Sequence, residues 1–432
     1  MASGEGQSNP STSGDAGKDH HEDFGDEYGP PLPTQEEIRE MEYRRLVGEA
    51  TNLMLNFAKD PKLAKYMSET AFQDVQVQLK ATTTSSPKPD SKKQYSEKEL
   101  EAILREGIGI DKFETDVHTL HPIITECRVI KSHYELDLLR FVNQISSQAH
   151  VEVMRAARPG MKEYQLESLF LHYVYMNGGC RHVSYTCVCA SGENSSTLHY
   201  GHAAAPNDKT IEDGGMALLD MGAEYHFYDS DITCSFPVNG IFTKKQRMVY
   251  EGVLNAQKAV IAAIKPGVSW IEMHTLAESI ILKALVKANI LSGHVEAMLE
   301  KRLGATFMPH GLGHFLGLDT HDPGGYCEGA KRPTDAGLKS LRTTRTLEKG
   351  MVITVEPGCY FIDALLDEAI KDPGTASFIN CEELENFRGF GGVRLEDDIV
   401  VTADGCENLT NCPREINDVE AVMAGKPWPL EE

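Results

Sequence analysis

An internal repeat is the feature that most constrains the fold of this 432-residue chain. Segment 139–170 aligns with segment 246–277, and a Pro-Gly pair occupies the same step of both copies, at Pro159-Gly160 and Pro266-Gly267. Each copy reads as a long amphipathic helix, a stop at Pro-Gly and a second helix. Two similar halves are therefore expected, each a helix pair that buries its apolar face on something shared. The alternative is a chance similarity between two amphipathic helices.

The shared element is predicted from three strand-like runs, which are residues 216–236, 350–362 and 391–402. They are rich in Val, Ile, Tyr and Thr and have Gly or Pro near their ends, a composition typical of antiparallel strands. The sequence therefore predicts an α+β domain in which a curved antiparallel sheet is backed by helices.

The front of the chain has a different character. Residues 1–35 are rich in Gly, Ser and Asp and predict a disordered acidic tail. Residues 36–80 predict a helical segment, and residues 81–97 a polar linker. From about residue 99 the pattern is that of a globular protein.

Charge and targeting signals narrow the class of function. The net charge of −23 excludes a nucleic-acid partner, because binding a phosphate backbone requires a basic surface. The sequence has neither an apolar run of the roughly 18 residues that a membrane span needs nor a secretory signal. Its ten cysteines are scattered and read as thiols of a reducing compartment. A soluble, cytoplasmic protein without a membrane partner is expected.

Four acids and one histidine interrupt or end apolar runs. A carboxylate in such a setting costs several kcal/mol unless it is paired or binds a cation, and few Lys or Arg residues lie nearby. Two divalent ions about 3.5–4 Å apart would satisfy the set and create a hydrolytic site. Oxygen-rich ligands with one imidazole favour Mn²⁺ over a thiolate-type zinc site. The candidate ligands are Asp220, Asp231, His314, Glu356 and Glu396.

Simpler interpretations exist for each of these residues. Asp220 and Asp231 read singly as solvated turn residues, and Glu356 before Pro357 as a strand end. Glu396 has Arg394 two residues away on the same strand face, which predicts a plain salt bridge as an equal alternative.

The HGLGH motif differs from the HExxH motif of zinc helices. Gly311 and Gly313 disfavour a helix, and no Glu follows His310. In an extended segment His310 and His314 would lie roughly 13 Å apart, at about 3.3 Å per residue, which is too far to share one ion. One of them is expected to be a ligand and the other a substrate or proton-transfer group, and spacing does not decide which.

The strand-like blocks also carry a family resemblance. The blocks 218–240, 306–326, 350–362 and 387–402, together with 184–208, resemble the signature blocks of prolidase, an Xaa-Pro dipeptidase of the pita-bread metallopeptidases. The likeness runs from about residue 104 to 425. It implies the pita-bread fold of two pseudo-symmetric halves, with residues 126–425 as the catalytic domain.

The resemblance also implies a function and a role for each site residue. The function is hydrolysis of Xaa-Pro dipeptides through attack of a metal-bridging hydroxide on the scissile carbonyl, with two divalent ions as cofactors. Asp220 would bind one metal, Asp231 and Glu396 would bridge both, and His314 would complete the other. Glu356 would be a further ligand and would also handle the proton of the metal-bound water. His321 would stabilise the intermediate, His310 would line the cleft, and Arg394 would support the ligands. His199 and Arg342 would contact the substrate carboxylate, and Tyr185 would shape the pocket.

The sequence departs from the prolidase pattern at its front. Prolidases begin with a mixed α/β domain, of which residues 98–125 are a remnant preceded by a short atypical segment. This departure leaves open whether the chain forms a homodimer. Two alternatives follow, an aminopeptidase P-like enzyme acting on longer Xaa-Pro peptides and a non-catalytic pita-bread scaffold.

Overall fold

The computed structural model of the protein describes residues 120–202, 205–327 and 329–430, which belong to one compact unit, Asp116–Glu432. The predicted tail, helical segment and linker lie outside the described residues. Of the predicted remnant 98–125, the described part is residues 120–125, which begin helix α4 (Leu120–Val129).

Two helix pairs occupy the positions that the repeat predicts, α5 (His133–Ala156) with α6 (Glu163–Gly178), and α7 (Lys244–Ala263) with α8 (Trp270–Lys287). The first helix of each pair begins with a capping box, in which the N-cap side chain and the third helical residue satisfy backbone amides that have no partner within the helix. The caps are Ser132 and Thr243. The predicted helix pairs are confirmed.

The turns between the paired helices are built alike. Gly160 has φ +92° and Gly267 has φ +89°, a region that glycine enters without steric cost. The amide of Gly160 donates to the carbonyl of Ile211 over 2.8 Å, and that of Gly267 donates to Leu347 over 2.9 Å. Each turn is thereby tied to a segment just before a core strand of its own half. We call residues 133–237 the first half and residues 244–408 the second half.

All the strand pairs are antiparallel among the described residues. Their order is β2-β3-β6 and β1-β4-β5 in the first half, and β11-β10-β7 and β8-β9 in the second. The strands are β1 (His182–Val183), β2 (Val188–Ser191), β3 (Met216–Asp220), β4 (Ala223–Tyr225), β5 (Tyr228–Asp229), β6 (Thr233–Pro237), β7 (Val352–Val355), β8 (Gly358–Tyr360), β9 (Gly392–Arg394), β10 (Asp397–Val401) and β11 (Cys406–Asn408).

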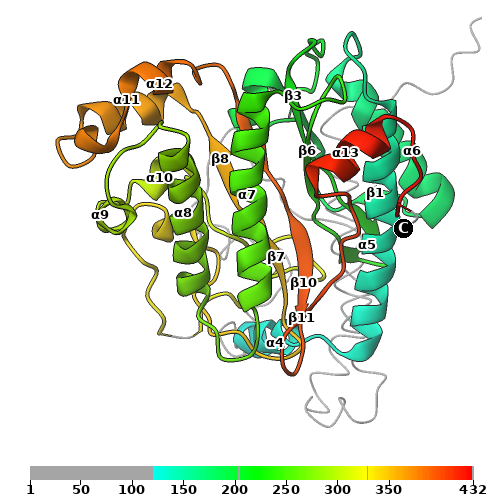
Figure 1. Cartoon of the computed structure of the whole chain (residues 1–432). Helices are drawn as coiled ribbons and strands as arrows, with labels where there is room; N and C mark the ends of the chain where they lie inside the picture. The colour runs from blue at the N-terminus through cyan, green and yellow to red at the C-terminus, as the bar shows by residue number, and fades with distance from the viewer. Residues whose placement is uncertain (1–119, 203–204, 328, 431–432) are drawn as a thin grey trace, which may run out of the picture. The chain divides into compact units, whose positions relative to one another are not determined.

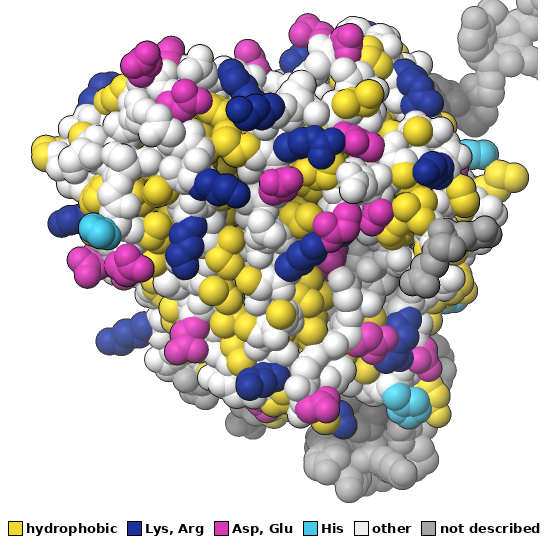
Figure 2. All heavy atoms as spheres, in the orientation of Figure 1, with side chains coloured by type: hydrophobic (Ala, Val, Ile, Leu, Met, Phe, Trp, Pro, Cys, Tyr) yellow, Lys and Arg dark blue, Asp and Glu magenta, His cyan; other side chains and the backbone are white. Residues whose placement is uncertain are grey.

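Helices cover one face of these strands, so the predicted α+β class is confirmed. In Figure 1, α5, α7 and α8 run in front of the strands, and apolar side chains such as Phe236, Val253 and Ile353 fill the space between the layers. On this helical face, acidic and basic side chains are interspersed, as is typical of a solvated surface (Figure 2). Among the described residues, no helix is long and apolar enough to cross a membrane.

Shorter helical elements complete the described chain. They are η3 (Gly192–Ser196), α9 (Val295–Glu300), α10 (Gly304–Phe307), η4 (Leu338–Ser340), α11 (Asp363–Lys371), η5 (Ala376–Phe378), α12 (Cys381–Glu385) and α13 (Ile416–Met423). The strands themselves break at the predicted acids, since β3 ends at Asp220, and Glu396 separates β9 from β10. These breaks place the acids at the centre of the strand layer.

Candidate metal centre

Two of the predicted acids come from the hairpin of the first half. Asp220 ends β3, opposite Thr233 at the start of β6, and Asp231 lies two residues before Thr233. Because side chains alternate between the faces of a strand, Asp220, Asp231 and Thr233 share one face. The hairpin therefore presents both carboxylates on the same side.

The other two acids come from the second half. In the antiparallel pair of β7 and β10, Val355 lies opposite Asp397. The residue after Val355 is Glu356 and the residue before Asp397 is Glu396, so the same register brings these two acids side by side. The two halves correspond here too. In each half a core strand follows the segment tied to the Pro-Gly turn, and Asp220 is the last residue of β3, whereas Glu356 immediately follows β7.

His314 is held against β7 by its own backbone. Its amide donates to Thr354 Oγ1 over 3.1 Å, and its carbonyl accepts from the amide of Thr354 over 2.9 Å. This close approach requires glycine at position 313, where a Cβ would lie 2.0 Å from the carbonyl oxygen of Thr354. The ring nitrogen Nδ1 lies 3.0 Å from the carbonyl of Phe315, so Nε2 is the nitrogen that faces the acids.

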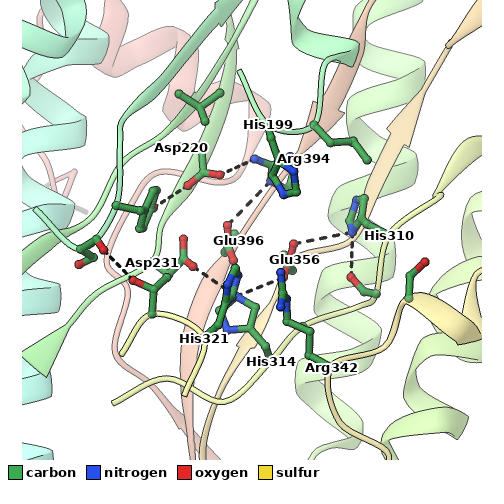
Figure 3. A pocket seen from close by; sticks show the side chains of 18 of the residues that line it. His199, Asp220, Asp231, His310, His314, His321, Arg342, Glu356, Arg394 and Glu396 are labelled. Atoms are coloured by element: carbon green, nitrogen blue, oxygen red, sulfur yellow. Dashed lines mark hydrogen bonds and ion pairs between the residues drawn. The ribbon is translucent and has the colours of Figure 1, made fainter. Parts of the chain in front are cut away.

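The imidazole and the acids converge on one small volume (Figure 3). One ligand atom each from Asp231, His314 and Glu396 lies within 4.8 Å of the others. His314 Nε2 lies 3.3 Å from Asp231 Oδ2 and 3.6 Å from Glu356 Oε1. The solvated-turn interpretation is therefore wrong for Asp231, which is 5% exposed.

Asp220 and Glu396 are oriented by neighbouring side chains. Tyr185 donates its hydroxyl to Asp220 Oδ1 and Arg394 Nη2 donates to Asp220 Oδ2, both over 2.5 Å. Thr233 donates to Glu396 Oε2 over 2.6 Å. Arg394 Nε lies 3.9 Å from the same carboxylate oxygen, so the arginine is bonded more closely to Asp220 than to the neighbour that the simple salt-bridge interpretation assigns to it.

The electrostatics of the cluster fit a divalent cation. Burial, followed by the negative charges of Asp231 and Glu356, raises the pKa of Glu396 well above its usual range. Burial also raises the pKa of Asp220, and it raises that of Glu356 to about 7. These shifts show that the neighbouring protein groups do not supply enough positive charge to neutralise the buried carboxylates. An oxygen-rich set with one imidazole suits hard divalent ions, which would supply that charge.

Asp231 and His314 behave differently from the other ligands because they bond to each other. Burial has the largest single effect and would raise the pKa of Asp231, but the hydrogen bond and charge of His314, together with Tyr185 and His321, lower it below its usual value. Burial would likewise lower the pKa of His314, but the hydrogen bond with Asp231 and the negative charges of Glu356 and Asp231 together raise it.

His310 lies on the opposite side of Glu356. Its Nδ1 is 2.8 Å from the carbonyl of Gly311 and 3.7 Å from Glu356 Oε2, and its Nε2 is 3.0 Å from the hydroxyl of Tyr360. Burial lowers the pKa of His310 to about 3, so the ring is neutral. The segment 308–314 is neither a helix nor an extended strand, and both histidine rings face the same carboxylate, so the spacing expected for an extended chain does not apply.

The cluster forms one wall of a cavity of about 840 Å³, and every site residue predicted from the sequence lines it. The remaining walls carry His199, Arg342 and His321, which are exposed to the cavity. The ring of His321 stands edge-on to that of His314 at a centroid distance of 4.4 Å. Burial, then the charges of His314 and Arg342, lowers the pKa of His321 to about 4. Burial likewise lowers the pKa of His199.

Some residues of this site were missed by the reasoning from sequence. His202 and Arg332 also line the cavity, and Thr233 and Thr354 hold the ligands in place. The threonines carry a usable signal, because each lies two residues from an acid along a strand and so shares its face. His202 and Arg332 are in irregular segments, where no such period exists.

Comparisons with known proteins agree with this geometry. A human protein named Xaa-Pro dipeptidase is 62% identical over 317 residues, which cover 73% of this chain and 64% of that protein. This chain therefore spans under two thirds of that relative's length. The mouse Xaa-Pro dipeptidase is 59% identical over the same length.

Solved structures show the same fold. A variant of Escherichia coli aminopeptidase P superposes with a TM-score of 0.63 at 33% identity, covering 82% of this chain and 74% of that one. Aminopeptidase PepP of Pseudomonas aeruginosa superposes with a TM-score of 0.62 at 33% identity, covering 76% of this chain and 69% of that one.

The family model described as Metallopeptidase family M24 matches residues 137–403, a stretch that holds both halves and every candidate metal ligand. The chain belongs to metallopeptidase family M24.

Proposed function

We propose that this protein is an Xaa-Pro dipeptidase that uses two divalent metal ions, with Mn²⁺ as the preferred ion. The proposal rests on the convergence of Asp231, His314 and Glu396 on one wall of a cavity that Arg342 and His199 also line. The similarity to proteins named Xaa-Pro dipeptidase supports the same substrate class.

In this proposal Asp220, Asp231, His314, Glu356 and Glu396 would hold the two ions. The ions supply Lewis acidity for the scissile carbonyl and lower the pKa of water so that a nucleophile exists near neutral pH. Tyr185 and Arg394 keep Asp220 in place through the two bonds to its oxygens, and such supporting contacts fix the orientation of a metal ligand.

The chain's own residues handle protons and charge. Glu356 lines the cavity beside His310, where its carboxylate would accept a proton from water and pass it to the leaving nitrogen. His321 stands beside His314 and faces the cavity, where its N–H donates to the oxyanion that develops at the carbonyl. His310 lines the cleft beside Glu356.

Recognition of the substrate rests on its ends. Proline lacks a backbone N–H, so an Xaa-Pro bond offers the protein no amide hydrogen bond at the cleavage site. Arg342 and His199 hold the terminal carboxylate, since a guanidinium donates two parallel hydrogen bonds to a carboxylate. A dipeptide is therefore the proposed substrate, because in a longer peptide the proline that follows the scissile bond carries no free carboxylate for Arg342 and His199 to bind.

A metal count with a turnover assay tests the proposal. Purified protein loaded with Mn²⁺ is expected to hold two ions per chain and to release proline from Gly-Pro, and protein treated with a chelator is expected to lose this activity. A chain that holds two ions yet leaves Gly-Pro uncut would refute the dipeptidase function. A chain that holds no ions at all would favour a non-catalytic scaffold.

A second enzyme function is favoured by the solved structures, which are aminopeptidases P. Such an enzyme would cleave Gly-Pro-Ala in preference to Gly-Pro. Arg342 argues for the dipeptide, and the ratio of kcat/KM values on the two peptides decides between the functions.

A further inference from the structure

Glu163, the first residue of α6, is an acid buried outside the cavity. Its side chain is fully buried, and Glu163 is absent from the cavity wall. An ionised carboxylate in such a place costs several kcal/mol unless hydrogen bonds replace the lost water. The partners that replace this water show what the residue does.

Five donors surround the carboxylate of Glu163. Oε1 accepts from the amide and the hydroxyl of Ser191, at 2.8 and 2.7 Å, and from Asn194 Nδ2 at 3.3 Å. Oε2 accepts from the hydroxyl of Tyr200 at 2.8 Å and from the amide of Lys209 at 3.3 Å. The donors span both ends of the segment 191–200, so this one side chain holds the whole segment against α6.

The segment held in this way carries His199. Tyr200 is 8% exposed, and its hydroxyl donates to Glu163 while accepting from Asn194 Nδ2 over 2.8 Å. His199, the preceding residue, is exposed and lines the cavity. Fixing the ring of Tyr200 under α6 therefore fixes the backbone from which His199 reaches the cavity.

The repeat offers an independent parallel. Trp270 is the first residue of α8 and occupies the same step of the second copy that Glu163 occupies in the first. Trp270 is also fully buried, and its Nε1 donates to the carbonyl of Gly313 over 3.3 Å. Gly313 immediately precedes His314, so in both halves the residue that starts the second helix holds a segment with a cavity-facing histidine.

We propose that Glu163 is a positioning residue for substrate binding, which acts through Tyr200 to hold His199 at the carboxylate end of the dipeptide. This inference rests on the proposed dipeptidase function. It assigns no contact between Glu163 and substrate or metal.

Kinetics of Glu163→Gln test the proposal. The amide keeps the shape of the side chain but has one acceptor oxygen, so the donors around Oε2 lose their partner. kcat/KM on Gly-Pro is expected to fall roughly tenfold, the order for losing a charge-assisted hydrogen bond, through a higher KM. On Gly-Pro amide, which lacks the carboxylate, kcat/KM is expected to stay the same. Equal losses on both substrates would mean that Glu163 only stabilises the fold.

A matched control lies one helical turn further along α6. Glu167 accepts from Asn207 Nδ2 over 2.8 Å and does not contact the segment 191–200 in any hydrogen bond of the described residues. Glu167→Gln is expected to leave both substrates unaffected. If Glu163→Gln does not fold, Tyr200→Phe removes one of the five bonds and is expected to give the same selective loss on Gly-Pro.

A double-mutant cycle tests whether the effect passes through His199. In a His199→Ala background, Glu163→Gln is expected to add no further loss on Gly-Pro, because the residue that it positions is gone. Additive losses would overturn the proposal.

A readout without turnover separates this inference from the proposed function. Failure of the wild-type protein to cleave Gly-Pro would refute the dipeptidase function alone. The ring ¹³C–¹H resonance of His199, assigned through His199→Ala, would still be expected to shift in Glu163→Gln, while that of His310 stays in place. An unchanged His199 resonance would refute positioning.

Discussion

Arg394 Nη2 donates to Asp220 Oδ2 over 2.5 Å and so joins a strand of the second half to a strand of the first. The same guanidinium donates from Nη1 to the hydroxyl of Tyr360 over 2.9 Å and from Nε to Thr233 Oγ1 over 3.0 Å. Arg394 is 4% exposed, so these bonds form away from bulk water. The guanidinium is therefore fixed by three bonds in its plane, and one of them orients the candidate ligand Asp220.

Arg394→Lys is expected to weaken metal binding roughly 10–100-fold, the range for the loss of a group that orients a ligand. An ammonium ion keeps the charge but cannot direct three bonds in the plane of a guanidinium. Titration with Mn²⁺, followed by activity at saturating metal, measures the effect. Wild-type metal affinity in this variant would show that the charge alone matters.

Asp231→Asn and Glu396→Gln are each expected to abolish tight metal binding and to reduce turnover of Gly-Pro to background. Each removes a negative charge from the group of ligand atoms that lie within 4.8 Å of one another. Asp404→Asn is a matched control, because Asp404 is exposed in a turn. Metal content per chain and kcat are the measurements, and full activity in either ligand variant would contradict the assignment.

Arg342→Ala is expected to raise KM for Gly-Pro by roughly tenfold or more, with kcat largely retained, because the residue is proposed to bind the carboxylate and not the reacting atoms. Lys339→Ala serves as the control, because Lys339 is exposed in η4, three residues before Arg342. Steady-state kinetics distinguish the two parameters. An unchanged KM would remove Arg342 from the carboxylate site.

Metal uptake is expected to release protons below pH 7. The pKa of Glu356 in the metal-free protein is raised by burial to about 7, so this group is mostly protonated at pH 6 and mostly ionised at pH 8. A cation binds the ionised form, so apparent affinity rises with pH and proton release falls between pH 6 and 8. Calorimetry in two buffers of different ionisation enthalpy counts the protons. A constant count across this range would disagree with the raised pKa.

The stability of the metal-free protein is expected to fall as pH rises. The folded-state pKa of Glu356 is raised above its ordinary value of 4.5, and that of Glu396 is raised by burial in the same direction. Such groups stabilise the fold below their unfolded pKa, and this contribution is lost as pH rises through the folded pKa. The Tm of chelated protein should therefore fall from pH 6 to pH 8, while metal-loaded protein keeps its Tm.

The main elements and the acids could be predicted because their signals are local. The repeat at Pro159 and Pro266 reads directly as two helix pairs, and Asp231 and Glu396 stand out against apolar neighbours in the sequence. The supporting contacts could not be predicted, because their partners are distant in sequence. Arg394 and Asp220 are 174 residues apart, whereas the separation of two residues between Arg394 and Glu396 predicts only the longer ion pair of 3.9 Å.

Glu163 is a second residue whose contacts could not be predicted from the sequence. An acid in the first turn of a helix is common on protein surfaces, where the helix dipole favours it. The side chains that cover it include Ser191, the last residue of β2, and Tyr200, which are 28 and 37 residues away in the sequence. The hydrophobic periodicity of one helix cannot predict contacts with residues that are so distant in the sequence.

The hydrogen bonds from Gly160 to Ile211 and from Gly267 to Leu347 close each half upon itself, whereas the candidate ligands are divided between the halves. The first half supplies two carboxylates and the second supplies the imidazole and two more. A cation bound there would therefore link the two halves. Separating the halves would release the ions, and neither half alone could retain them.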